Sequence, residues 1–98
     1  MTIDEFIRLH VIVEGHVQGV GFRFFVQDKA NSLDIRGWVR NRWDGTVEVI
    51  AEGVRENLDS LVHAFYQGTR ASTVTNINTK RQTATGEFTH FNIRLTSN

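Results

Sequence analysis

A glycine-rich stretch, GHVQGVGFR, occupies residues 15–23 and contains residue types that could bind an anion. Glycine allows the backbone to adopt positive φ angles and to approach a ligand closely. Successive N–H groups of such a loop can point at one place, and the positive end of a following helix adds to their effect. Arg23 ends the stretch with a planar set of donors suited to two phosphoryl oxygens. These residues indicate a site for a phosphoryl group.

The same stretch has a purely structural interpretation, in which the glycines only turn the chain and Arg23 is a solvated helix residue. The stretch fits neither common nucleotide-binding fingerprint, because no Lys–Ser/Thr pair follows the glycines and their spacing differs from G-x-G-x-x-G. On these residues alone, the structural and the anion-binding interpretations have similar weight.

The stretch lies between a predicted strand and a predicted helix. Apolar and polar residues alternate over residues 7–14 with the period of two that is typical of a half-buried strand. From Phe22 the apolar residues follow helical spacing, and we expect this helix to fray at Asn31-Ser32. The apolar face of the predicted helix consists of Phe22, Phe25, Val26, Ala30 and Leu33.

The middle of the chain predicts a hairpin and a second helix. Asp44-Gly45 is a turn dipeptide, and β-forming residues flank it over residues 35–42 and 46–51. A helix is expected after Gly53, with Asn57 or Asp59 supporting its first turn and Gly68 ending it. Its apolar face would consist of Leu58, Leu61, Val62 and Phe65.

The last thirty residues predict two more strands. Val74 and Ile77 indicate a strand of limited burial, and residues 83–87 (TATGE) indicate a turn. Residues 88–95 alternate through Phe91, Ile93 and Leu95 and predict a final strand.

This order predicts an α+β fold of the ferredoxin-like, split β-α-β type: β-α-β-β-α-β with a short extra strand. We expect a mixed, mostly antiparallel sheet covered by two helices on one face, in a single domain over residues 1–98. A right-handed crossover makes the first and second strands parallel. The loop after Glu14 and the segment near Asn41 should therefore meet at one edge of the sheet.

Asn41 would end the second strand at that edge. Its amide can donate a hydrogen bond to a water molecule or accept one from it. Alternatively, Asn41 only leads into the turn at Asp44-Gly45, a role that asparagine favours for local reasons.

The composition limits the other classes of function. Eleven basic and eleven acidic side chains balance to a formal charge of zero, which argues against a dedicated nucleic-acid-binding protein. Cysteine is absent, so disulfides and thiolate chemistry are excluded. The first ten residues carry acids and no long apolar run, so we expect no signal peptide. No stretch approaches the ~20 apolar residues of a membrane span. We expect a cytoplasmic monomer.

Two segments resemble the signatures of the acylphosphatase family. GHVQGVGFR matches its pattern of Gly, any residue, Val-Gln-Gly-Val, any residue, Phe-Arg. GWVRNRWDGTVEVIAEG, over residues 37–53, matches the second signature, including Asn41. The two motifs cover about a quarter of the chain without a departure, and the order of elements fits the family's ferredoxin-like fold. A few extra N-terminal residues and the polar TSN end differ from the family's pattern.

The resemblance implies hydrolysis of the carboxyl-phosphate bond of small acyl phosphates, with a carboxylate and inorganic phosphate as products. It implies that the catalytic residues are Arg23 and Asn41, and that Asn41 positions the attacking water. It also implies that the phosphate is bound by His16, Val17, Gln18, Gly19, Val20, Gly21, Phe22 and Arg23. No metal and no cofactor are expected, because the carboxylate is a good leaving group and phosphoryl transfer depends mainly on positioning and charge.

Other interpretations remain open at this point. The four histidines, His10, His16, His63 and His90, show no metal-binding spacing, and His16 takes the variable place of the first motif. We expect Trp38 and Trp43 to be packing or rim residues rather than a ligand cage. RGWVRNRW partly matches the RNP1 pattern of RNA-binding sheets, although no net positive charge supports that function. A catalytically silent domain that binds an anion is a third candidate.

Overall fold

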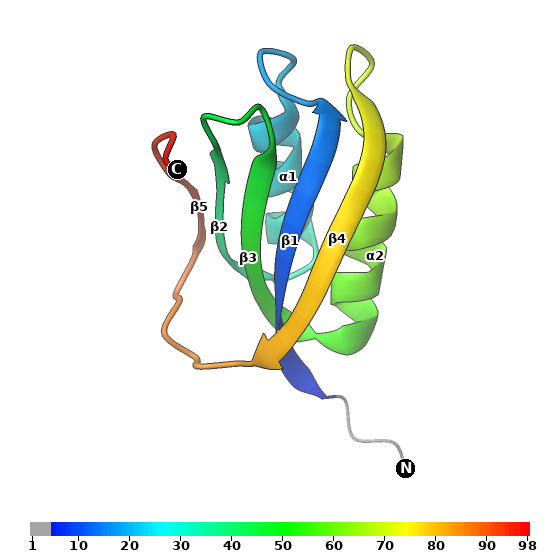
Figure 1. Ribbon diagram of the computed structural model, residues 1–98. Coiled ribbons are helices and arrows are strands. Elements are labelled where there is room, and N and C mark those ends of the chain that lie inside the picture. Colours follow the sequence, from blue (N-terminus) through cyan, green and yellow to red (C-terminus); the bar gives the residue numbers. More distant parts are fainter. Residues whose placement is uncertain (1–4) are drawn as a thin grey trace.

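The computed structural model describes residues 5–98, and in it two helices pack on one face of a five-stranded sheet (Figure 1). The elements are β1 (Phe6–His16), α1 (Phe22–Ser32), β2 (Arg36–Asn41), β3 (Val47–Val54), α2 (Arg55–Gln67), β4 (Thr73–Thr83) and β5 (Phe91–Ile93). The predicted α+β, ferredoxin-like fold class is confirmed. Two predictions concern residues 1–4 in part, and these residues lie outside the described ones. They are the absence of a signal peptide and the departure of the N-terminal residues from the family's pattern.

Strand β3 sets the direction of its neighbours in the sheet, whose order is β4-β1-β3-β2-β5. It pairs antiparallel with both β1 and β2, so these two strands run parallel to each other. Strand β4 pairs antiparallel with β1, and β5 pairs parallel with β2, which confirms a mixed, mostly antiparallel sheet. The loop after β1 and the turn after β2 therefore leave the same edge of the sheet, as predicted (Figure 1).

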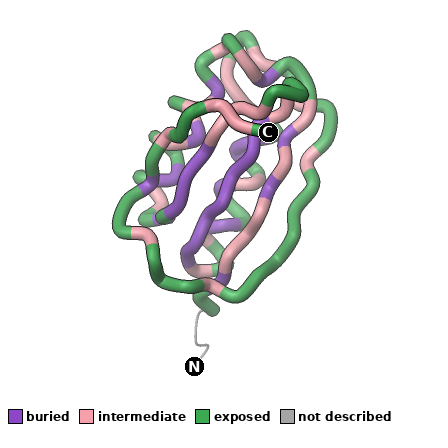
Figure 2. Tube along the Cα trace, turned by 60° about the vertical axis from the view of Figure 1, so that its left-hand side comes forward, coloured by how far each residue is buried: buried purple, intermediate pink, exposed green. Residues whose placement is uncertain are grey.

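The hydrophobic core lies between the sheet and the helices. Alternate side chains of the central strands point toward the helices, as Val11, Val13 and Val49 do, and each is at most 1% exposed. Phe22 of α1 and Phe65 of α2 meet across this layer with ring centroids 6.0 Å apart. Buried residues run along the middle of the sheet in Figure 2. Burial of this apolar surface is the main source of stability of the fold.

The predicted hairpin between β2 and β3 is confirmed. Gly45 adopts a φ of 92°, and the N–H of Thr46 donates to Oδ1 of Asp44 at 2.9 Å. The N–H of Arg42 closes the turn on the carbonyl oxygen of Thr46, also at 2.9 Å. Strand β3 continues to Val54, three residues beyond the predicted end, because it pairs along that length with β1.

The start of α2 differs from the prediction. Neither Asn57 nor Asp59 caps its first turn: the capping position is Val54, which provides no side-chain hydrogen bond. The side chain of Asn57 instead donates to the carbonyl oxygen of Leu33 and so ties α2 to the end of α1. Val62 is only partly buried, whereas Ala64 is buried on the face that we predicted.

The end of the chain also differs from the prediction of a strand over residues 88–95. Strand β5 covers only Phe91–Ile93, and Leu95 is 90% exposed. The chain nevertheless stays beside β2, since Arg94 N–H donates to the carbonyl oxygen of Val39 at 2.8 Å. Regular pairing has stopped by Leu95, and the alternation of apolar residues no longer leads to burial there. The polar end is held beside the end of β2, because Ser97 N–H donates to the carbonyl oxygen of Asn41 and Ser97 forms a parallel bridge with Arg42, the next residue.

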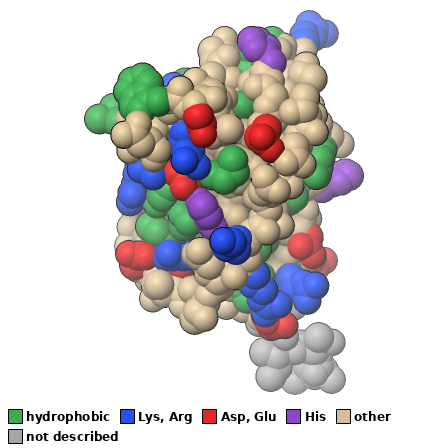
Figure 3. Space-filling view, in the orientation of Figure 1, with side chains coloured by type: hydrophobic (Ala, Val, Ile, Leu, Met, Phe, Trp, Pro, Cys, Tyr) green, Lys and Arg blue, Asp and Glu red, His purple; other side chains and the backbone are tan. Residues whose placement is uncertain are grey.

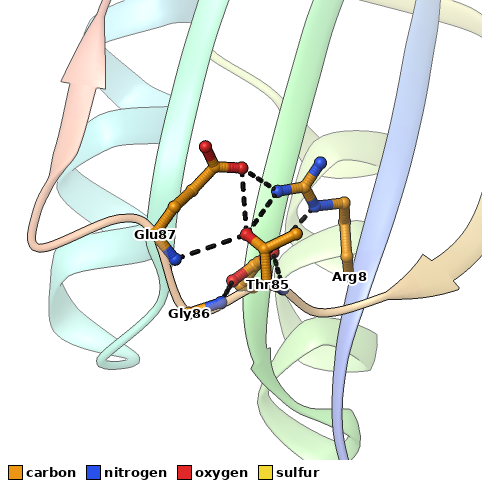
Figure 4. A network of polar contacts seen from close by, with 5 residues as sticks. Arg8, Thr85, Gly86 and Glu87 are labelled. Carbon is orange, nitrogen blue, oxygen red and sulfur yellow. Dashed lines mark hydrogen bonds and ion pairs between the residues drawn. The ribbon is translucent and has the colours of Figure 1, made fainter.

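A network of polar contacts fixes the segment that crosses from β4 to β5 (Figure 4), and a buried carboxylate is part of it. Glu52 is 1% exposed and accepts hydrogen bonds from Arg8 Nε at 2.7 Å and from the N–H groups of Thr85 and Gly86 at 2.9 Å. Burial raises the pKa of Glu52, but these hydrogen bonds and the nearby charge of Arg8 outweigh burial and hold the pKa below its usual value. The folded state therefore favours the ionised carboxylate.

We predict that Glu52→Gln lowers the free energy of unfolding at pH 7 by about 2–3 kcal/mol, because hydrogen bonds to a charged acceptor are lost. A carboxylate with a depressed folded-state pKa stabilises the fold above its unfolded pKa of ~4.3 and loses this effect as the pH falls through the folded pKa. The difference between variant and wild type should thus shrink in acid. Urea unfolding between pH 7 and pH 3 measures it.

The matched control is Asp28→Asn, at an exposed position inside α1 and outside its first turn, which should change the unfolding free energy little at any pH. A Glu52→Gln variant as stable as wild type at pH 7, or a difference that stays constant down to pH 3, would contradict the stabilising role of this ionised carboxylate.

Candidate active site

The glycine-rich loop connects β1 with α1 at the edge of the sheet where β2 also ends (Figure 1). Gly19 and Gly21 adopt φ angles of 73° and 75°, in the left-handed region that residues other than glycine rarely adopt. A Cβ atom at either position would meet nothing within 4 Å. Glycine is therefore required here by the backbone conformation and not by lack of space.

The backbone N–H groups in the middle of this loop find no acceptor in the part of the chain that the structure describes. Among residues 5–98, no hydrogen bond is donated by the N–H groups of residues 18–21. The loop opens into the first turn of α1, whose N–H groups also lack helical partners and which contains no acidic residue. The positive end of the helix dipole is thus not neutralised. The arrangement can bind an anion with several backbone donors.

Two side-chain hydrogen-bond systems hold this loop from opposite sides. Gln18 Nε2 donates to the carbonyl oxygens of Arg42 and Thr46, each at 2.8 Å, and so joins the loop to the β2–β3 turn. On the other side, Thr69 Oγ1 donates to the carbonyl oxygen of Val20 at 2.9 Å. A loop with two left-handed glycines is thereby fixed to both of its neighbouring turns.

Arg23 and Asn41, which we predicted as catalytic residues, line the same small cavity although Asn41 lies eighteen positions after Arg23 in the sequence. Oδ1 of Asn41 is buried and has no hydrogen-bond partner in the part of the chain that the structure describes. The C-terminal segment holds the backbone of Asn41, since Ser97 N–H donates to the carbonyl oxygen of Asn41 at 3.1 Å. The cavity has a volume of about 190 Å³ and is lined by Val17, Gly19, Gly21, Phe22, Arg23, Phe24 and Asn41.

The other predicted loop residues contribute differently. The side chains of Val17 and Phe22 are buried, each 1% exposed, and anchor the two ends of the loop in the core. Val20 packs against the core from a partly buried position, and the amide of Gln18 turns toward the hairpin. His16 is exposed at the end of β1 and does not line the cavity.

Phe24 lines the cavity next to Arg23 and is 68% exposed, although no sequence motif predicts a role for it. Helical spacing places it outside the apolar face of α1, so periodicity alone gives it no role. The available signal was a large apolar residue at an outward position directly after Arg23. Thr69 and Ser97 had no sequence signal of this kind, because their contacts with the loop and with Asn41 arise only in the folded chain.

The helix-free face of the sheet carries charges of both signs among apolar side chains (Figure 3). Glu48 accepts from both His10 Nε2 and Arg40 Nε at 2.7 Å. Trp38 is 8% exposed, and its ring is contacted by the guanidinium groups of Arg40 and Arg94 at 4.6 and 4.8 Å from the centroid. Base stacking of the RNA-binding kind would require displacement of these groups, so this geometry weakens the RNA-binding interpretation.

Trp43 is 74% exposed at the β2–β3 turn, whereas Trp38 packs on the sheet. Three of the histidines, His16, His63 and His90, are exposed. Within residues 5–98, no three His, Cys, Asp or Glu side chains form a group that could hold a metal ion. In the same residues, no helix has the length and apolar character needed to cross a membrane.

A family model, curated relatives and a solved structure all match this chain and carry the same family name. The family model described as acylphosphatase matches residues 9–93. An acylphosphatase of Pelotomaculum thermopropionicum is 49% identical over 86 residues, which cover 88% of this chain and 94% of that protein. An acylphosphatase of Bacillus licheniformis is 45% identical over 87 residues, with 89% and 97% covered. The crystal structure of acylphosphatase from Bacillus subtilis superposes with a TM-score of 0.87 at 42% identity, covering 90% of this chain and 98% of that one.

Proposed function

The chain belongs to the acylphosphatase family and is a hydrolase of acyl phosphates, and from this premise we propose that the reaction takes place in the cavity shared by Arg23 and Asn41. The observation that carries the proposal is that both side chains line one cavity beside a loop in which the N–H groups of residues 18–21 have no acceptor among residues 5–98. The proposed substrate is a small acyl phosphate, cleaved to a carboxylate and inorganic phosphate.

In this proposal, the loop from His16 to Phe22 binds the phosphoryl oxygens through its backbone N–H groups. Arg23 adds a planar guanidinium group that can donate two parallel hydrogen bonds to two of these oxygens. Donors fixed before the substrate arrives stabilise the charge that redistributes over the phosphoryl oxygens as the bond to the carboxylate breaks. The left-handed backbone of Gly19 and Gly21 supports this interpretation.

Asn41 positions the attacking water. Its buried Oδ1 is an acceptor without a partner in residues 5–98, so it can orient a water O–H group. The water oxygen forms a bond to phosphorus while the bond from phosphorus to the acyl oxygen breaks, and the carboxylate leaves with the electron pair. An amide is a poor base, so the water proton passes to an oxygen of the substrate's own phosphoryl group.

The proposed mechanism uses no metal and no cofactor. A carboxylate is a good leaving group and needs little protonation by a general acid, so positioning and charge stabilisation carry most of the catalysis. We also propose that the protein acts as a cytoplasmic monomer of a single domain, as its sequence predicts.

The purified protein should hydrolyse benzoyl phosphate and acetyl phosphate at the same rate with and without EDTA, because no step depends on a metal. A stable monoester, phenyl phosphate, should be hydrolysed far more slowly, since its leaving group is poorer. Release of inorganic phosphate measures all three reactions. Strict dependence on an added metal would contradict the mechanism, and no turnover of either acyl phosphate would favour RNA binding or a silent anion-binding domain.

Variants of the two cavity residues should separate binding from turnover. Asn41→Ala should lower kcat by about 10²–10³-fold, the typical cost of losing one preorganised polar group, while its Kd for inorganic phosphate stays near the wild-type value. Arg23→Ala should weaken phosphate binding by at least about tenfold and also lose turnover. Arg23→Lys should remain poor, because one ammonium group cannot replace two parallel donors. Steady-state kinetics and calorimetric titration with phosphate measure these effects.

The matched controls for these variants are Asn78→Ala on β4 and Arg36→Ala on β2, both at exposed positions outside the cavity lining. They should leave kcat and the Kd for phosphate unchanged. Wild-type turnover by Asn41→Ala would remove Asn41 from its proposed role, and wild-type phosphate affinity in Arg23→Ala would do the same for Arg23.

A further inference from the structure

A side chain of the turn between α2 and β4 forms a hydrogen bond with the glycine-rich loop. Thr69 Oγ1 donates to the carbonyl oxygen of Val20 at 2.9 Å, and no family motif identified in the sequence includes Thr69. We propose that Thr69 is a positioning residue, which fixes the peptide group between Val20 and Gly21 so that the Gly21 N–H faces the phosphoryl site. The proposal rests on the proposed function, in which the loop N–H groups bind phosphate.

The peptide group between Val20 and Gly21 is the part of the loop that most needs an external contact. Val20 stands between two glycines in left-handed conformations, and glycine loses more conformational freedom on ordering than other residues. Gln18 fixes the beginning of the loop, and Phe25 N–H fixes its end on the carbonyl oxygen of Gly21 at 3.1 Å. Between these points, the hydrogen bond from Thr69 holds the carbonyl group of Val20.

The direction of one carbonyl determines the direction of the adjoining N–H. A trans peptide group is planar, and its C=O and N–H bonds point to opposite sides. Residues 5–98 contain no cis peptide bond. Because the Val20 carbonyl is turned toward Thr69, the Gly21 N–H is turned away from the α2–β4 turn. Gly21 lines the cavity with Arg23 and Asn41 and donates to no group in the described residues, so this N–H is available to a phosphoryl oxygen.

Thr69 is itself held rigidly. Its N–H donates to Ser72 Oγ at 2.7 Å, and Ser72 Oγ donates back to the carbonyl oxygen of Thr69 at 3.0 Å. Gly68 precedes it with a φ of 60°, and a Cβ there would lie 2.2 Å from Ser72 Oγ. This tight turn stands beside the loop after β1 at the same end of the sheet (Figure 1). The Thr69 hydroxyl is thus presented to Val20 from a fixed turn.

Two substitutions of Thr69 test the proposal. Thr69→Val removes the hydroxyl at similar volume, so the peptide group after Val20 can rotate and the Gly21 N–H is no longer held toward the site. We expect the Kd for inorganic phosphate and the KM for benzoyl phosphate to rise about tenfold, the usual scale for one hydrogen bond to a charged group. Thr69→Ser keeps the hydroxyl and should restore both constants to within about threefold of wild type.

The matched control is Thr83→Val, at an exposed position at the far end of β4, which should leave both constants unchanged. Thermal unfolding of every variant is measured in parallel, and binding is measured where all are folded. A role in stability alone would lower the melting temperature of Thr69→Val without changing phosphate affinity of the folded protein.

Phosphate affinity of Thr69→Val equal to that of wild type would overturn the proposal, and so would a Thr69→Ser variant no better than Thr69→Val. A wild-type protein that hydrolyses acyl phosphates but fails to bind phosphate at the loop would overturn the proposed function of the loop itself, and this proposal with it. The Thr69 proposal fails alone when wild type binds phosphate and Thr69→Val binds it equally well.

Discussion

The antiparallel pairing of β3 with both β1 and β2 is the constraint on which the site depends. It makes β1 and β2 parallel, and both end at one edge of the sheet. Arg23 at the start of α1 and Asn41 at the end of β2 can then line one cavity. Chemistry that needs a phosphoryl group and a water molecule side by side is thus supported by the buried, paired central strands of the sheet.

The loop combines local freedom with external restraint. N–H groups at residues 18–21 without an acceptor in the described chain, together with left-handed glycines, make binding of an anion possible. They also leave the loop with few hydrogen bonds of its own. Gln18 and Thr69 supply the restraint from the two neighbouring turns, and Val17 adds burial. Glu52 and its hydrogen-bond donors lie at the opposite end of the sheet, where they stabilise the segment that crosses from β4 to β5. The residues that fix this crossing therefore lie apart from the proposed site.

The sequence predicts those features that depend on local pattern. Alternation and helical spacing predict both helices and the first strand, and Asp44-Gly45 predicts the hairpin. The motifs predict that Arg23 and Asn41 lie near each other, while their catalytic roles stay predictions. The contacts of Thr69 with Val20 and of Ser97 with Asn41 join residues about fifty apart in sequence and leave no periodic signal. The predicted length of β5 was wrong, because an edge strand ends where its pairing with the neighbouring strand ends and not where the alternation of apolar residues ends.

The central claim is that the N–H groups of residues 18–21, together with Arg23, form the phosphoryl site. Titration of ¹⁵N-labelled protein with inorganic phosphate tests it most directly, since each backbone amide reports separately. Saturable shifts should concentrate on the amides of residues 18–21 and on the Arg23 side chain. Shifts confined to other cationic positions, such as Arg55 and Arg81 beside the cavity between α2 and β4, with residues 18–21 unchanged, would contradict the claim.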